Sequence, residues 1–258
     1  MWRAIVGLSL LAACNGAQLH DAIVDGGGGA KPDSSGTTAI DAPSSSIDAP
    51  ADAATTASCN NGRVVYLNFD GVTITQAATS DATQNLASWI GVTTANVPPY
   101  HSGNTNRAAQ ITNITTTVQS ILSQYPITVV TTRPAAGPYV MIAFGGTNQT
   151  VGSNYTYATS YHDCGDLVKS DVGWVSDTVP NSIVANTAVG TIGWSLGLQG
   201  TTDSNDCMCA WASTCTPSST PCTLGTNETT GTSKTPATTC PGLNPQNEQA
   251  AFHAAFCQ

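Results

Sequence analysis

Short apolar runs bounded by turn residues predict five β-strands in the middle of the chain. The segment RVVYLNFDGV (63–72) alternates apolar and polar side chains, and Asn-Gly and Asp-Gly pairs mark its two ends. ITVVTTR (127–133) and YVMIAFGG (139–146) are rich in β-branched and aromatic residues, and the second is apolar almost throughout, as central strands are. Two further strands are expected at NYTYATSYH (154–162) and DVGWVSD (171–177).

Apolar residues at helical spacing predict three helices. Residues 105–124 place an apolar side chain at every third or fourth position, and a Tyr-Pro pair ends the run. Residues 180–197 repeat the pattern, with a proline near the first turn and Gly197 as the stop. A shorter helix is expected at 244–256. The element order predicts a mixed α/β domain of about 200 residues.

The N-terminal residues lack this periodicity and predict a leader and a tether. Residues 1–13 contain an arginine and an apolar run too short to span a bilayer, and Leu-Ala-Ala precedes Cys14. This resembles a bacterial lipoprotein signal, which implies cleavage before Cys14 and lipidation of its sulfur. A secretory signal that merely contains a cysteine is the alternative. Residues 14–58 carry too few apolar side chains to offset the entropy of ordering, so we expect a disordered tether before a domain at 59–258.

The charge composition limits which classes of partner and which cell compartment fit this protein. The 258-residue chain has 7 Lys and Arg against 16 Asp and Glu, and a net charge of −9. So few basic residues cannot neutralise a run of phosphates, which argues against nucleic acid as a partner. Together with the lipoprotein-like leader, this predicts a protein of the bacterial cell envelope, anchored to the membrane by lipid on its periplasmic or cell-surface side.

The cysteine count points to an exported protein with disulfides. Removing Cys14 from the nine cysteines leaves eight, and an even number in an exported chain predicts a disulfide framework without fixing the pairing. These eight are Cys59, Cys164, Cys207, Cys209, Cys215, Cys222, Cys240 and Cys257. The alternative is a zinc–thiolate cluster made by Cys207, Cys209, Cys215 and Cys222, whose spacing contains no C-x-x-C pair.

The segment GTIGWSLGLQG (190–200) and the following NDCMC, which contains Met208, carry a family resemblance. They resemble the H-E-x-x-H-x-x-G-x-x-H motif and methionine turn of the metzincin zinc metallopeptidases, of the matrixin-like type. Gly197 matches the turn glycine of the motif, and VVYLNFDG (64–71) resembles the first strand of the family. The resemblance covers roughly 63–258. It implies a twisted mixed sheet of about five strands, an active-site-type helix, a methionine turn and a C-terminal helix.

The residues that carry the family's chemistry are missing from the motif. The three histidine positions hold Gly190, Trp194 and Gly200, and the general-base position holds Thr191. None of these side chains supplies an imidazole for zinc or a carboxylate that accepts a proton from bound water. The resemblance therefore implies an inactive scaffold with no catalytic residue, metal or cofactor. An extended peptide or protein segment is then expected in the remnant cleft, paired with an edge strand near 154–162.

Two other interpretations stay open at this point. GWSLG matches the G-x-S-x-G nucleophile elbow, with Ser195 as nucleophile and Asp203 or Asp206 and then His253 as partners, but the residues after it are poor helix formers. An active hydrolase, either this serine enzyme or a zinc endopeptidase with unrecognised ligands, is thus one alternative. A structural envelope lipoprotein is the other. The remaining histidines predict no metal site because they are scattered, at His20, His101, His162 and His253.

Overall fold

The computed structural model describes residues 62–211, 215–218, 221–231, 240 and 245–257. The chain divides into two units, Met1–Thr55 and Thr56–Gln258, and everything below concerns the second. The leader, Cys14, the whole tether predicted at 14–58 and Cys59 lie outside the described residues. Within the described part, no helix has the length and apolar character needed to cross a membrane.

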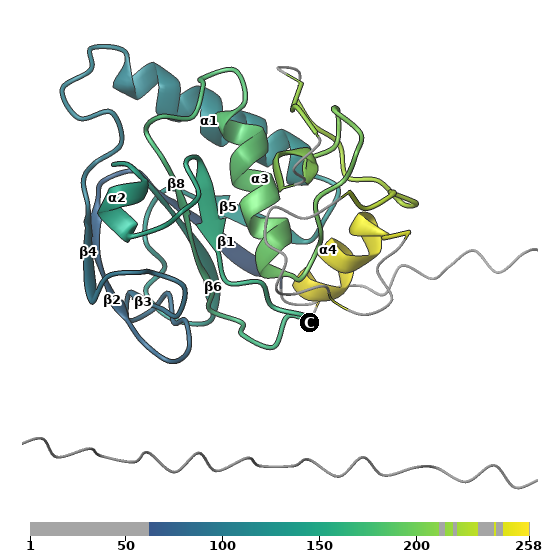
Figure 1. Cartoon of the computed structure of the whole chain (residues 1–258), viewed down its shortest axis with the longest axis horizontal. Helices are drawn as coiled ribbons and strands as arrows, with labels where there is room; N and C mark the ends of the chain where they lie inside the picture. The colour runs from purple at the N-terminus through teal and green to yellow at the C-terminus, as the bar shows by residue number, and fades with distance from the viewer. Residues whose placement is uncertain (1–61, 212–214, 219–220, 232–239, 241–244, 258) are drawn as a thin grey trace, which may run out of the picture. The chain divides into compact units, whose positions relative to one another are not determined.

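A mixed five-stranded sheet forms the centre of the domain (Figure 1). Its strands, in spatial order, are β5 (Ile127–Val130), β1 (Arg63–Asn68), β6 (Tyr139–Phe144), β8 (Val172–Val175) and β7 (Ala158–Ser160). Neighbouring strands are parallel except β7, which runs antiparallel to β8 at one edge. Every residue of β6 is buried, which explains why its sequence is apolar almost throughout.

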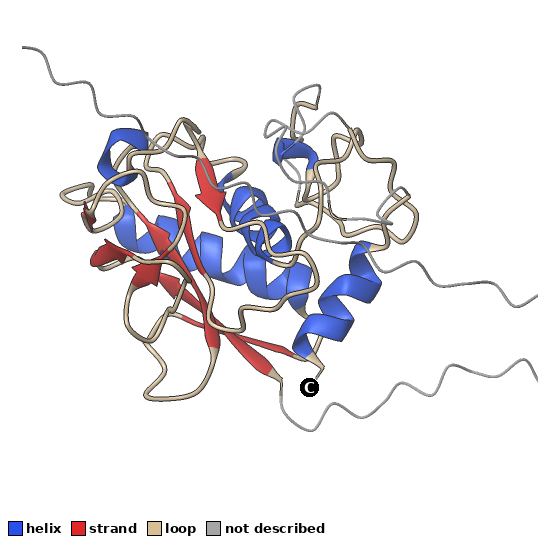
Figure 2. Ribbon diagram, turned by 60° about the horizontal axis from the view of Figure 1, so that its bottom comes forward, coloured by secondary structure: helices blue, strands red, loops and turns tan. Residues whose placement is uncertain are grey.

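Both faces of this sheet are covered, and the covering differs between them. Along β1, Val65 and Leu67 pack with the helices, whereas Tyr66 belongs to a second apolar cluster on the opposite face. The helical layer contains α1 (Arg107–Leu122), α3 (Val184–Ser195) and α4 (Glu248–Phe256), and Figure 2 shows these helices beside the sheet. With the short helix α2 (Asn148–Val151), the described part is an α/β fold with four α-helices.

The opposite face carries a small second sheet that the sequence analysis did not predict. Its strands are β2 (Val72–Gln76), β3 (Leu86–Ala87) and β4 (Thr94–Val97), in the order β3-β2-β4. They are short, and in β2 and β4 exposed threonines and asparagine alternate with buried Ile74, Ala95 and Val97. These few apolar positions, together with Tyr66, Met141 and Trp174 of the central sheet, make up the second cluster.

Several element boundaries differ from the sequence-based expectation. Helix α3 begins at Val184, because the carbonyl of Pro180 accepts a bond from the Ile183 N–H and forms a separate turn before the helix. The strand expected at 154–162 is reduced to the three residues of β7. Helix α4 starts later than expected, at Glu248, where the Asn247 side chain accepts a bond from the Ala250 N–H and caps the helix.

Disulfides join the segments that follow the sheet. The described pairs are Cys164–Cys240, Cys207–Cys222 and Cys209–Cys215, and Cys257 is disulfide-bonded as well. The four cysteines of the zinc–thiolate alternative are therefore consumed in two disulfides and present no thiolate for a metal. The disulfide framework predicted from the cysteine count is present in the described residues.

Candidate functional site

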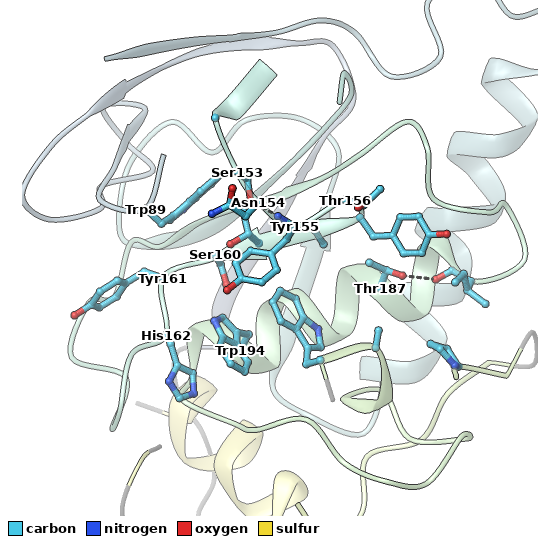
Figure 3. A pocket seen from close by; sticks show the side chains of 18 residues that line it. Trp89, Ser153, Asn154, Tyr155, Thr156, Ser160, Tyr161, His162, Thr187 and Trp194 are labelled. Carbon is cyan, nitrogen blue, oxygen red and sulfur yellow. Dashed lines mark hydrogen bonds between the residues drawn. The ribbon is translucent and has the colours of Figure 1, made fainter. Parts of the chain in front are cut away.

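A groove of about 680 Å³ lies between the edge strand β7 and helix α3 (Figure 3). One wall is residues 152–162, which include β7, and the opposite wall comes from α3 and from the short 3-10 helix Cys209–Trp211. The lining is aromatic and hydroxyl-bearing. It consists of Trp89, residues 152–162, Ile183, Thr187, Trp194, Ala210, Trp211 and Pro217. Among these described residues there is no Asp, Glu, Lys or Arg, so the groove presents an uncharged surface.

Three stacked rings form what we call the groove floor: His162, Trp194 and Trp211. The Trp194 ring centroid lies 4.1 Å from that of His162 and 4.8 Å from that of Trp211, and the two indoles are nearly parallel at 14°. The rings come from three separate places: the segment after β7, helix α3 and the 3-10 helix. Trp194 is only 4% exposed, so it packs into the core and borders the groove at once.

The other motif positions contribute backbone or buried packing rather than ligands. A Cβ placed on Gly190 would lie 2.5 Å from the Cys207 carbonyl oxygen and 2.6 Å from Trp211 Nε1, so no side chain fits there without movement. Thr191 is fully buried, does not line the groove, and donates its hydroxyl to the Thr187 carbonyl at 2.7 Å. The Gly200 carbonyl accepts a bond from the Gly231 N–H at 2.8 Å.

The exit of α3 and the methionine that follows it are fixed by backbone conformation and packing. Gly197 has φ of +84°, a left-handed conformation that favours glycine, and it turns the chain out of α3. Met208 is fully buried and packs against Gly193 of the same helix. The Met208 N–H donates to Asp206 Oδ1 at 2.6 Å, which holds the turn in shape beneath the helix.

Ser195 does not have the surroundings of a nucleophile. It is the last residue of α3, so a helix rather than a strand precedes it, and it is 1% exposed. Its hydroxyl donates to the Ile192 carbonyl at 2.7 Å within the same helix. None of the hydrogen bonds given for the described residues joins Ser195 to Asp203, Asp206 or His253, so no Ser-His-Asp relay is assembled.

His162 belongs to a group that the sequence did not single out. His162, Cys164 and Cys240 are residue types that bind metals, and their potential ligand atoms lie within 4.8 Å of one another. Among the described residues, this is the one such group of three or more. The two sulfurs are joined in a disulfide, so they cannot act as thiolate ligands. Burial lowers the pKa of His162, and the neutral ring bonds to the Leu198 carbonyl at 3.2 Å. The group is therefore a packed support for Trp194 rather than a zinc site.

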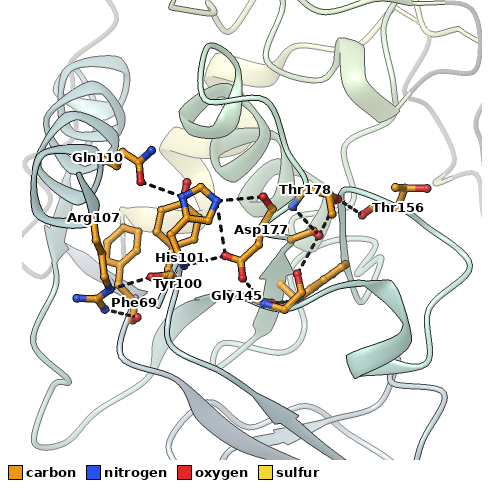
Figure 4. A network of polar contacts seen from close by, with 12 residues as sticks. Phe69, Tyr100, His101, Arg107, Gln110, Gly145, Thr156, Asp177 and Thr178 are labelled. Atoms are coloured by element: carbon orange, nitrogen blue, oxygen red, sulfur yellow. Dashed lines mark hydrogen bonds and ion pairs between the residues drawn. The ribbon is translucent and has the colours of Figure 1, made fainter. Parts of the chain in front are cut away.

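A second histidine lies in a separate polar network, shown in Figure 4. The His101 ring stacks on Tyr100, and its Nδ1 and Nε2 bond to Gln110 Oε1 and to the Asp177 carbonyl. The Asp177 carboxylate accepts bonds from the N–H groups of His101 and Gly146 at 3.0 and 2.9 Å. Because both oxygens of this carboxylate accept backbone donors, the network ties the loop after β4 to the loops after β6 and β8.

No protein-family model matches the chain, and no curated protein matches it.

Proposed function

We propose that this chain is a non-catalytic, metallopeptidase-like protein of the bacterial envelope that binds an extended peptide or protein segment in the groove beside β7. A lipid anchor at Cys14 would tether it to the membrane through residues 14–58. The observation that carries the proposal is an edge of β7 that no described strand pairs with, above a floor of three rings in contact.

The metzincin-like scaffold is supported by how the parts of the groove are arranged. Helix α3, the turn at Gly197 and the buried Met208 follow one another as the resemblance implies. An antiparallel edge strand borders the groove on the other side. At two of the positions where the motif has histidines, Gly190 and Trp194 lie against Trp211 and supply no imidazole. The proposed activity is therefore binding and not hydrolysis.

The free edge of β7 is suited to strand addition. The Ser176 N–H donates to the Tyr157 carbonyl at 2.8 Å, so residue 157 directs its backbone groups toward β8. Hydrogen-bonding direction alternates along an antiparallel strand, and the backbone groups of Ala158 and Ser160 therefore point away from β8. An extended peptide would pair with these groups, and alternate side chains of that peptide would reach the groove floor.

The lining of the groove indicates what kind of side chain it accepts. Indole and phenol rings supply most of its large side chains, and no charged residue of the described part faces a ligand there. Tyr157 and Tyr161 are both 42% exposed, so they are available to contact a bound peptide without being required for the core. The proposed ligand is therefore an extended segment that carries aromatic or aliphatic side chains.

Peptide selection tests this function directly. The soluble chain without its first 14 residues is screened against a displayed library of random peptides of about ten residues, and selected sequences are resynthesised with alternate backbone N–H groups methylated. We expect apolar extended peptides whose binding falls at least about tenfold on methylation, since each lost backbone bond weakens strand pairing. Replacing Tyr157 and Tyr161 by Ala should weaken binding by a similar factor.

Leu167→Ala is the matched control, because Leu167 is 80% exposed and does not line the groove. A library that yields no binder, or binders indifferent to methylation and to both tyrosine changes, contradicts the proposal. Chelator-sensitive cleavage of any selected peptide by the purified protein would favour the active-hydrolase alternative instead.

A further inference from the structure

Acidic side chains converge behind the methionine turn in what we call the carboxyl cluster: Asp206, Glu228 and Glu248. Glu248 is the first residue of α4, and its oxygens accept bonds from Gln246 Nε2 at 2.7 Å and from the Gly225 N–H at 3.2 Å. The Glu228 carboxylate lies against Gly225. The cluster thus joins three segments: the methionine turn, residues 221–231 and α4.

Asp206 and Glu248 are buried without a basic partner in the described part of the chain, and Glu228 is partly exposed. Asp206 is 3% exposed and Glu248 is 0% exposed. Burial raises the pKa of both groups, and the nearby charge of Asp206 raises that of Glu248 further. The four described Lys and Arg residues bind elsewhere: Arg63 and Lys169 at Asp166, Arg107 at Phe69 and Asp70, and Arg133 at Tyr139 and Ala82. Uncompensated buried carboxylates are costly, and a bound cation removes that cost.

The hydroxyl group of Thr201 lies beside the Asp206 carboxyl of this cluster. Thr201 is fully buried, and its side chain lies close enough to Asp206 to lower the pKa of that carboxyl. Neither Thr201 Oγ1 nor Asp206 Oδ2 has a hydrogen-bond partner within bonding distance among the described residues. Thr201 Oγ1 and Asp206 Oδ2 thus add two unpartnered oxygens beside the Glu248 carboxyl, and oxygen ligands are what a hard cation prefers.

We propose that this cluster is a calcium site, in which oxygens of Asp206, Glu248 and Thr201 bind the ion and Glu228 completes the negative charge. Calcium takes six to eight oxygen ligands in irregular geometry, so backbone or water oxygens would complete its shell beside these three residues, whereas magnesium demands a near-ideal octahedron. Zinc is disfavoured because the cluster offers neither imidazole nor thiolate. Binding displaces the proton that Glu248 holds in the ion-free protein.

The site is connected to the groove through the methionine turn. Asp206 Oδ1 accepts from the Met208 N–H, and the Met208 carbonyl accepts from the Trp211 N–H at 3.0 Å. A calcium ion at Asp206 would therefore order the same short segment that places Trp211 in the groove floor. This makes calcium a structural ion of the domain, independent of whether a peptide binds.

Calcium titration of the soluble chain tests the proposal. After chelator treatment, isothermal titration is expected to find one Ca²⁺ per chain with release of a proton, and an affinity that rises up to about tenfold for each pH unit while Glu248 is protonated. At a Ca²⁺ concentration of about 100 times Kd, the thermal midpoint should rise by roughly 5–10 °C, and the same Mg²⁺ concentration should shift it by less than about 2 °C.

Matched variants assign the site. Glu248→Gln keeps a neutral group of the same shape, so it should fold and lose the calcium shift, and Asp206→Asn should do the same. Asp203→Asn is the control that should keep most of the shift, because the exposed Asp203 accepts a bond from the Asn205 N–H and acts on Asp206 and Glu228 through its charge alone.

Two results would overturn the proposal. One is titration of the wild-type chain that detects no Ca²⁺ binding near neutral pH, a measurement that needs no variant to fold. The other is a calcium shift that persists undiminished in both Glu248→Gln and Asp206→Asn.

Discussion

The groove floor and the carboxyl cluster share residues 206–211, and they are filled in opposite ways. In the floor, Trp194 stacks on Trp211 and contacts the tilted ring of His162, and Trp211 Nε1 is buried without a hydrogen-bond partner among the described residues. In the cluster, Asp206 and Glu248 are buried with unbalanced charge and with oxygens that lack partners. The difference teaches that two neighbouring parts of one segment can be filled differently, one by ring packing and the other by buried acids that require a proton or a cation.

Removing the central ring of the floor should have the largest effect. Trp194→Ala leaves a cavity between His162 and Trp211, and we expect the free energy of unfolding to fall by about 3–5 kcal/mol in urea titration. Trp194→Phe keeps most of the stacking area and should lose less than half of that. A loss below about 1 kcal/mol for the alanine variant would show that the rings do not stabilise the fold.

Restoring a side chain at the first motif position tests how closely the floor is packed. Alanine normally stabilises a helix interior relative to glycine by about 1 kcal/mol. At Gly190 a Cβ would overlap the Cys207 carbonyl and the Trp211 ring, so we expect Gly190→Ala to destabilise the protein by about 1–3 kcal/mol. An unfolding midpoint equal to or above that of the wild type would mean that Trp211 moves easily, and the packed-floor interpretation would be wrong.

The sequence predicts an element well where its pattern of apolar residues lies within one segment, and poorly where distant segments come together. Strong apolar periods located β1, β6, α1 and α3, and the motif led to Trp194, Gly197 and Met208. The second sheet was missed because its strands are short and because β2 and β4 are half polar. The calcium hypothesis had no sequence signal, since Asp206 and Glu248 are brought together from distant segments by the fold.

The groove floor shows the same limit at the level of single side chains. The motif alignment gave Trp194 but neither of its stacking partners, because His162 and Trp211 reach it from segments with no fixed spacing to α3. Thr191 occupies the position of the catalytic base, yet the helix directs it toward the sheet. A Cβ on Gly173 of β8 would lie 2.6 Å from the Thr191 methyl. Side-chain direction is decided here by packing against that glycine.

Asp171 is a third buried acid, and it shows whether raised carboxyl pKa values also occur outside the carboxyl cluster. The pKa of Asp171 is raised to about 8, mainly by burial. The charges of Asp163 and Asp166 also raise this pKa, and the charge of Arg63 lowers it. A carboxyl group whose pKa is higher in the folded than in the unfolded state loses stabilisation as pH rises toward the folded pKa. For a folded pKa of about 8, the loss between about pH 7 and pH 8 is about 1 kcal/mol.

Asp171→Asn removes this titration and should flatten that part of the pH profile of urea midpoints. Asp206 and Glu248 act in the same direction, because their pKa values are raised as well, so the profile should be measured with and without Ca²⁺. A slope that is unchanged in Asp171→Asn would mean that Asp171 is already ionised at neutral pH. The carboxyl cluster would then account for the whole effect.

The smallest expected change separates the groove from the serine-hydrolase alternative. Ser195→Ala removes one hydrogen bond to the Ile192 carbonyl, which also accepts a bond from the Leu196 N–H, so no buried acceptor is left without a donor. We expect a loss of only about 0.5–1 kcal/mol in unfolding free energy and no change in peptide binding. A fluorophosphonate probe should label neither the wild type nor the variant. Labelling of the wild type that disappears in Ser195→Ala would require the end of α3 to open and expose the hydroxyl, and the helix-buried serine described here would then be the resting state of an enzyme.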